Sequence, residues 1–74
     1  MSYQNIIIRN PEILRGKPII KGSRISVELI LKKLSEGMTF NQLIDIYPSL
    51  TTDKILACLE YASKIISNDD LLVS

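Results

Sequence analysis

Residues 16–25 read GKPIIKGSRI, and this stretch separates two different sequence patterns. Before it, residues 3–9 read YQNIIIR, a short apolar run typical of a β-strand that is covered on both faces. After it, apolar residues recur at helical spacing as far as Ile66. Gly16 and Gly22 allow the sharp turns that a change of direction requires. We therefore interpret residues 16–25 as the junction between a small β arm and a helical bundle.

Two extended pieces and a turn are expected in the arm. The segment Asn10–Leu14 resembles a single helical turn, with Asn10 as its cap and Pro11 at its first position. Gly16 is suited to end this turn in the left-handed conformation. Pro18–Ile20 is then a second extended piece, which can pair with residues 3–9 in a hairpin-like arm or with another subunit.

Three helices are predicted after the junction. Ser26 is the expected N-cap of the first helix, and Gly37 ends it. Residues 39–42, TFNQ, match a T-x-x-Q capping box at the start of the second helix, which Pro48 ends. Thr51 is the expected cap of the third helix. Its apolar stripe consists of Ile55, Leu59, Ala62 and Ile66, and the pattern breaks at residues 68–70.

This layout predicts a mainly α fold, a trihelical helix-turn-helix with a short N-terminal β arm. One domain covers residues 1–74, with the β arm and turns in 1–25, the three helices in 26–66 and a tail in 67–74. In such a fold the third helix can enter the major groove of DNA. The alternative is a plain three-helix bundle that contacts no DNA.

The apolar content exceeds what so small a domain can bury. Of 74 residues, 46% are hydrophobic, and isoleucine and leucine together number 23. A second buried surface is therefore expected, either in a homodimer or against an obligate partner. The expected interface residues are the apolar residues of the arm and of the tail: Ile6, Ile7, Ile8, Ile19, Leu71 and Leu72.

Charge is distributed unevenly along the chain. Residues 1–33 hold seven Lys or Arg against two Glu, whereas residues 34–74 hold two Lys against six Asp or Glu. This asymmetry favours a nucleic-acid surface on the first half and a protein partner on the second, although a simple solubility pattern would look the same.

The residue types available for catalysis are few. The chain has no histidine, and its lone cysteine, Cys58, lies near the apolar stripe of the third helix, where a core role is expected. A phosphate-binding P-loop needs the order Gly-Lys-Ser or Gly-Lys-Thr, but residues 21–23 read Lys-Gly-Ser. No residues show metal-ligand spacing. We therefore expect no enzyme, cofactor or metal site. We also expect a soluble protein of the cytoplasm, because no leader or membrane-spanning run is visible.

Two groups of residues are candidates for DNA contact. The first comprises cations of the arm and its junction, and the second comprises polar residues at the start of the third helix. These candidates are Arg15, Lys17, Lys21 and Arg24, and then Thr51, Thr52 and Lys54. The alternative is that the lysines are solvated turn residues and that Arg24 pairs with a helix carboxylate. Asp53 and Glu60 would oppose a phosphate contact if they were exposed.

The whole pattern resembles the family called domain of unknown function 433. Residues 10–27 carry N-P-E-I-L-x-G-K-P-x-I-K-G-S-R-I-x-V, residues 47–51 carry Y-P-x-L-T, and residues 59–62 carry L-E-Y-A. The resemblance extends from about residue 5 to residue 66, with Ser23 where threonine is expected. It implies a homeodomain-like helix-turn-helix and a VapB-like antitoxin. Such a protein would neutralise a small PIN-like nuclease toxin and would repress the shared operon by binding double-stranded operator DNA.

Overall fold

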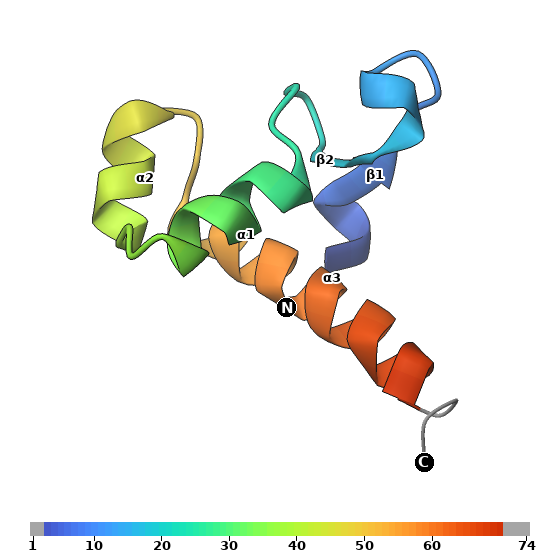
Figure 1. Cartoon of the computed structure of the whole chain (residues 1–74). Coiled ribbons are helices and arrows are strands. Elements are labelled where there is room, and N and C mark those ends of the chain that lie inside the picture. Colours follow the sequence, from blue (N-terminus) through green and yellow to red (C-terminus); the bar gives the residue numbers. More distant parts are fainter. Residues whose placement is uncertain (1–2, 71–74) are drawn as a thin grey trace.

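The computed structural model describes residues 3–70 as a mainly α structure with a small two-stranded sheet (Figure 1). The sheet lies beside the N-terminal end of α1, and α3 runs beneath the other elements in the view of Figure 1 and projects past them. The elements in chain order are the 3-10 turn η1 (Tyr3–Asn5), β1 (Ile7–Arg9), the 3-10 turn η2 (Leu14–Gly16), β2 (Pro18–Ile20), α1 (Val27–Ser35), α2 (Phe40–Ile46) and α3 (Thr52–Asp70).

The predicted hairpin arm is present, but its first strand is shorter than expected. β1 and β2 pair antiparallel, with Ile7 opposite Ile20. The first part of the predicted strand is instead the turn η1, closed by a hydrogen bond from the Ile6 N–H to the Tyr3 carbonyl. The Tyr3 N–H donates to Glu60 Oε1 at 2.7 Å, so η1 is held against α3 and does not extend the sheet.

The predicted helical turn at Asn10–Leu14 is wrong in form. Asn10 does act as a cap, because its Oδ1 accepts a hydrogen bond from the Glu12 N–H at 2.9 Å, but the result is a tight turn that ends in extended backbone at Ile13. Leu14 and Arg15 then adopt positive φ values of 49° and 58°. Gly16 follows with φ 82°, which confirms its predicted left-handed conformation.

The predicted helix caps are confirmed. Ser26 Oγ accepts a hydrogen bond from the Leu29 N–H at 3.0 Å. Thr39 and Gln42 form both bonds of the capping box, at 2.9 and 3.1 Å. Thr51 Oγ1 accepts from the Lys54 N–H at 3.2 Å. These bonds satisfy N–H groups that a helix start leaves unpaired. The end of α3 differs from the prediction, because the helix continues past Ile66 to Asp70.

The core lies between the hairpin and the three helices. Its buried apolar side chains are Ile7, Ile19, Ile20, Val27, Ile30, Leu43, Leu50, Ile55, Ala57 and Cys58. Ile7 and Ile19 are only 6% and 1% exposed, so the expectation that they face a partner is corrected: their side chains belong to the core of the chain itself. Ile6 and Ile8 are half-buried, and Leu71 and Leu72 lie outside the described residues.

The predicted core role of Cys58 is confirmed, since its side chain is fully buried. Within residues 3–70, no helix combines the length and the apolar character that crossing a membrane requires.

Candidate nucleic-acid interface

The turn between β2 and α1 holds Lys21 and Arg24 outward. It is closed by a hydrogen bond from the Ile20 N–H to the Ile25 carbonyl at 2.9 Å. Ser23 Oγ strengthens the turn, because it donates to the Ile20 carbonyl at 2.8 Å and accepts from the Ile25 N–H at 3.0 Å. Threonine would supply the same hydroxyl. Both cationic side chains are exposed on this bonded scaffold.

Arg24 is not engaged in the helix ion pair that was one of its two expected roles. Among residues 3–70 the ion pair to the first turn of α1 is made by Lys17, whose Nζ lies 3.0 Å from Glu28 Oε1. Arg24 instead lines a hollow of about 250 Å³ beside Ile8 and Ile13. Its guanidinium therefore remains available to a ligand.

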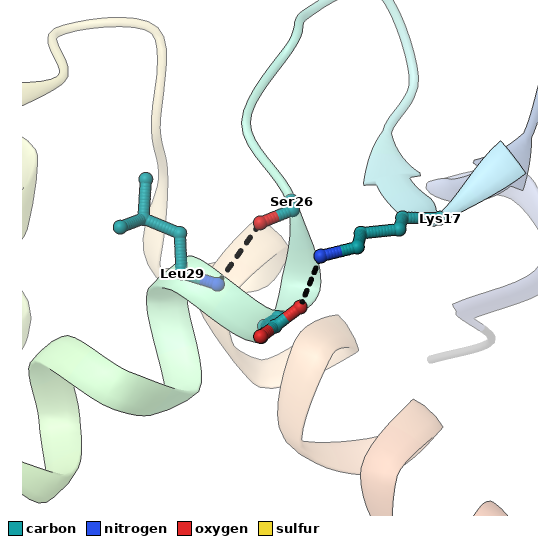
Figure 2. Close-up of polar contacts among 4 residues, drawn as sticks. Lys17, Ser26 and Leu29 are labelled. Atoms are coloured by element: carbon teal, nitrogen blue, oxygen red, sulfur yellow. Dashed lines mark hydrogen bonds and ion pairs between the residues drawn. The ribbon is translucent and has the colours of Figure 1, made fainter. Parts of the chain in front are cut away.

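A second, larger hollow of about 490 Å³ lies at the N-terminal end of α1. Arg15 and Lys17 line it together with Ser26 and Glu28. Figure 2 shows the Lys17 ion pair and the Ser26 cap side by side at this helix end. Both partners of the ion pair are well exposed, so it contributes at most about 1 kcal/mol and an anion can compete for Lys17.

Two of the three candidate side chains at the start of α3 make hydrogen bonds within the chain. Thr51 caps the helix, and Lys54 Nζ donates to the Ser49 carbonyl at 2.7 Å. Thr52 is exposed and makes no side-chain hydrogen bond within the described part of the chain. Of the three predicted contact residues on this helix, Thr52 has the freest side chain.

The two groups of candidate residues remain separate in the structure. Arg15 and Lys17 share one hollow and Arg24 lines another, but no hydrogen bond or ion pair within residues 3–70 joins them to Thr51, Thr52 or Lys54.

The two carboxylates that oppose DNA contact have different surroundings. Asp53 is exposed in the first turn of α3, where it complements the helix dipole. Glu60 is half-buried, and its carboxylate accepts the Tyr3 N–H. Of these two carboxylates, Asp53 is the more exposed, and it lies in the first turn of α3 beside Thr52 and Lys54.

An apolar hollow of about 330 Å³, which was not predicted from the sequence, lies between α1 and the second half of α3. Its apolar lining consists of Pro18, Val27, Leu31, Tyr61, Ala62, Ile65 and Ile66. Arg9 was missed as well; its guanidinium binds the Tyr61 hydroxyl. The apolar stripe of α3 indicated that apolar side chains line this helix. The sequence did not show which of them the other elements bury and which stay exposed.

Within residues 3–70, no group of three or more His, Cys, Asp or Glu side chains is arranged to hold a metal ion. Burial raises the pKa of the Cys58 thiol to about 11, so this group is a neutral core side chain near pH 7.

Comparison with known proteins identifies the family. The family described as "Protein of unknown function (DUF433)" matches residues 7–62, which include the hairpin, α1, α2 and the first half of α3. The chain belongs to the DUF433 family. The matched residues also contain all seven candidate DNA-contact positions.

Two DUF433 comparisons extend this result. The chain is similar to a crystal structure of a DUF433 member from Anabaena variabilis, with a TM-score of 0.81 and 26% identity, covering 95% of this chain and 69% of the other. It is also 29% identical over 59 residues to the uncharacterized protein y4eO of Sinorhizobium fredii. That match covers 80% of this chain but 27% of y4eO, so the chain spans about a quarter of that relative's length.

Proposed function

We propose that this chain is the antitoxin of a type II toxin–antitoxin pair, which neutralises a PIN-like nuclease toxin and represses its own operon by binding operator DNA. The supporting observation is the α2–α3 unit, in which a short capped helix contacts a longer helix whose first turn is capped by Thr51. This arrangement is typical of a helix-turn-helix, here of the homeodomain-like, trihelical kind. The chain would act in the cytoplasm, with no catalytic activity of its own.

Phosphate contacts would come from the cations of the junction. Arg15, Lys21 and Arg24 are exposed, and none makes an ion pair within the described part of the chain. Base contacts would come from Thr52 and the free hydroxyl hydrogen of Thr51, with the positive end of the α3 dipole directed at the duplex. Affinity would therefore depend strongly on salt, because most of it would come from the DNA backbone.

A mobility-shift titration of the upstream DNA of its gene tests this function. Each lost phosphate contact reduces the slope of log K against log salt by about 0.9. We expect Lys21→Ala and Arg24→Ala each to weaken binding and to flatten this slope. Lys64→Ala is the matched control, since Lys64 is an exposed lysine on α3 outside the candidate residues. No shift at low salt would contradict DNA binding. An equal loss in the control would contradict the assignment of the phosphate contacts to the junction.

Toxin neutralisation would use apolar surface that the chain leaves uncovered. The hollow between α1 and α3 is almost entirely apolar, and its wall residue Ile65 is 43% exposed. We expect this chain to co-purify with a PIN-like protein encoded beside it and to inhibit its nuclease activity. Ile65→Asp should weaken this complex and leave the DNA shift unchanged. Failure to co-purify on co-expression would contradict the antitoxin role.

A second candidate is a protein-interaction module that binds no DNA. It is favoured by the internal hydrogen bonds of Thr51 and Lys54, which occupy part of the polar surface that base contact needs. The same two assays separate the candidates, because this module would bind its protein partner but would give no DNA shift at any salt concentration.

A further inference from the structure

Within the described part of the chain, residues 63–67 of α3 lie at the surface. All five residues in the range 63–67 are exposed, and the helix continues beyond them to Asp70. Figure 1 shows this end of α3 projecting past the rest of the structure. Helices in proteins gain most of their stability from tertiary packing of an apolar face. The exposed isoleucines at this end of the helix therefore offer apolar surface to a partner.

The exposed apolar residues continue a stripe that begins in the core. Ile55 is fully buried, Leu59 is 38% exposed and Ile66 is 58% exposed. Positions 55, 59, 62 and 66 recur every three or four residues, which places them on one side of the helix. The stripe is thus buried at Ile55 and exposed at Ile66.

The exposed part of the α3 stripe is self-complementary. We define the α3 seam as Leu59, Ala62, Ser63 and Ile66, which together with Ser67 line a shallow hollow of about 460 Å³ on the helix. In chain order the seam runs large, small, small, large, so it reads the same in both directions. Small residues at the centre let two helix backbones approach closely, while the large residues at the ends fill the space beside them.

We propose that the α3 seam binds the same seam of a second copy of this chain, with the two helices antiparallel. The two-fold axis passes between Ala62 and Ser63. Leu59 of each copy then packs against Ile66 of the other, and the small residues meet at the crossing. Such a contact is isologous, since each pair of residues occurs twice.

Charge also favours a second copy as the occupant. The four seam residues are uncharged, whereas an acidic or basic partner would be expected to meet a complementary charge. The formal net charge of the chain is +1, so two copies repel each other weakly. The seam is about two helical turns long, which predicts a weak and concentration-dependent dimer, with Kd on the order of 10 μM. The seam contains none of the residues assigned to DNA contact, but it shares Ala62 and Ile66 with the hollow assigned to the toxin, so the dimer is tested on this chain alone.

Sedimentation equilibrium of the full chain tests the proposal. We expect a monomer at about 1 μM and mostly dimer at about 500 μM. Ile66→Asp should weaken the dimer at least tenfold. Ile46→Asp is the matched control, because Ile46 is 53% exposed but lies on α2, outside the seam. Circular dichroism should show the same helix content in the wild type and both variants. A monomer at 500 μM, or a dimer that survives Ile66→Asp, would overturn the proposal.

Disulfide cross-linking tests the antiparallel direction. Chains with Leu59→Cys and with Ile66→Cys are oxidised separately and as a mixture; the native Cys58 is buried and does not compete. The antiparallel seam predicts efficient cross-linking of the mixture, in which Leu59→Cys of one chain bonds Ile66→Cys of the other. Efficient cross-linking within each separate sample, and none between them, would show a parallel pair and would contradict the proposed contact.

Discussion

The guanidinium of Arg9, at the end of β1, donates two hydrogen bonds to the Tyr61 hydroxyl in the middle of α3, at 2.8 and 3.2 Å. The ring of Tyr61 also meets the edge of the Tyr3 ring, with centroids 5.2 Å apart and planes at 83°. Next to it, Glu60 accepts the Tyr3 N–H. Two adjacent residues of α3 therefore hold both ends of the segment that contains η1 and β1.

Removal of the Tyr61 hydroxyl tests the contribution of this contact. Tyr61→Phe should lower the free energy of unfolding by about 0.5–1 kcal/mol, because the Arg9 hydrogen bonds are exposed. Tyr61→Ala should cost about 2 kcal/mol, since it also removes the ring contact with Tyr3. Urea denaturation measures both changes.

Tyr47→Phe is the control for this experiment. Tyr47 is also half-buried, and its hydroxyl makes no hydrogen bond within residues 3–70. Its loss should change stability by less than about 0.5 kcal/mol. Equal effects of the two Tyr→Phe substitutions would contradict a specific Arg9–Tyr61 contribution, and so would additivity of Tyr61→Phe with Arg9→Met.

The capping box at the start of α2 should be worth about 1 kcal/mol. Thr39→Ala removes the oxygen that accepts the Gln42 N–H. Because α2 has only seven residues, the loss of this hydrogen bond should lower the stability of the whole helix. Asn41→Ala is the matched control, because Asn41 is exposed in the same helix and its substitution leaves the cap intact. Thermal unfolding should show a lower midpoint for Thr39→Ala and an unchanged or slightly higher one for Asn41→Ala.

Local features of the fold were predictable from the sequence, and distant contacts were not. The Ser26 cap and the Thr39–Gln42 box depend on residues three positions apart, so the sequence shows both partners together. The contacts of Tyr3 and Arg9 join residues 57 and 52 positions apart, and no local pattern indicates them. Because Tyr3 is held by α3, the predicted strand lost its first residues to η1.

The candidate site shows the same division. Exposure of Lys21 and Arg24 follows from the glycine and serine of their turn, which the sequence displays. Which cation pairs with the first turn of α1 depends on how β2 lies against that helix. The sequence permits Arg24 in this role, whereas Lys17 is the residue that contacts Glu28 in the structure. Side-chain partners across elements therefore required the three-dimensional arrangement.

Gly22 should tolerate asparagine better than alanine. Its φ is 81°, in the left-handed region, and a Cβ at this position would meet no atom within 4 Å. The cost of Gly22→Ala is therefore conformational, about 1 kcal/mol. Gly22→Asn should cost less, because asparagine adopts this conformation more readily. Urea denaturation that gave equal losses for the two variants would show a different cause.

Cys58 should make stability fall at alkaline pH. Burial raises the pKa of its thiol from 9.0 to about 11. Below pH 9 the thiol is protonated in both the folded and the unfolded chain, so its contribution is fully present. As pH rises through 9 and toward 11, the unfolded chain loses this proton while the folded chain keeps it. The free energy of unfolding should therefore fall across this window, by an amount on the order of 2 kcal/mol.

Comparison with Cys58→Ala isolates the contribution of the thiol from every other effect of alkaline pH on stability. At pH 7 the variant should be less stable by about 1 kcal/mol, because the fully buried sulfur is lost from the core. Toward pH 11 the wild type should lose this advantage, since only the wild type carries the raised thiol pKa. Urea denaturation at pH 7, 9 and 10.5 measures the difference. Parallel stability curves for the two chains would show that the thiol titrates alike in the folded and unfolded states.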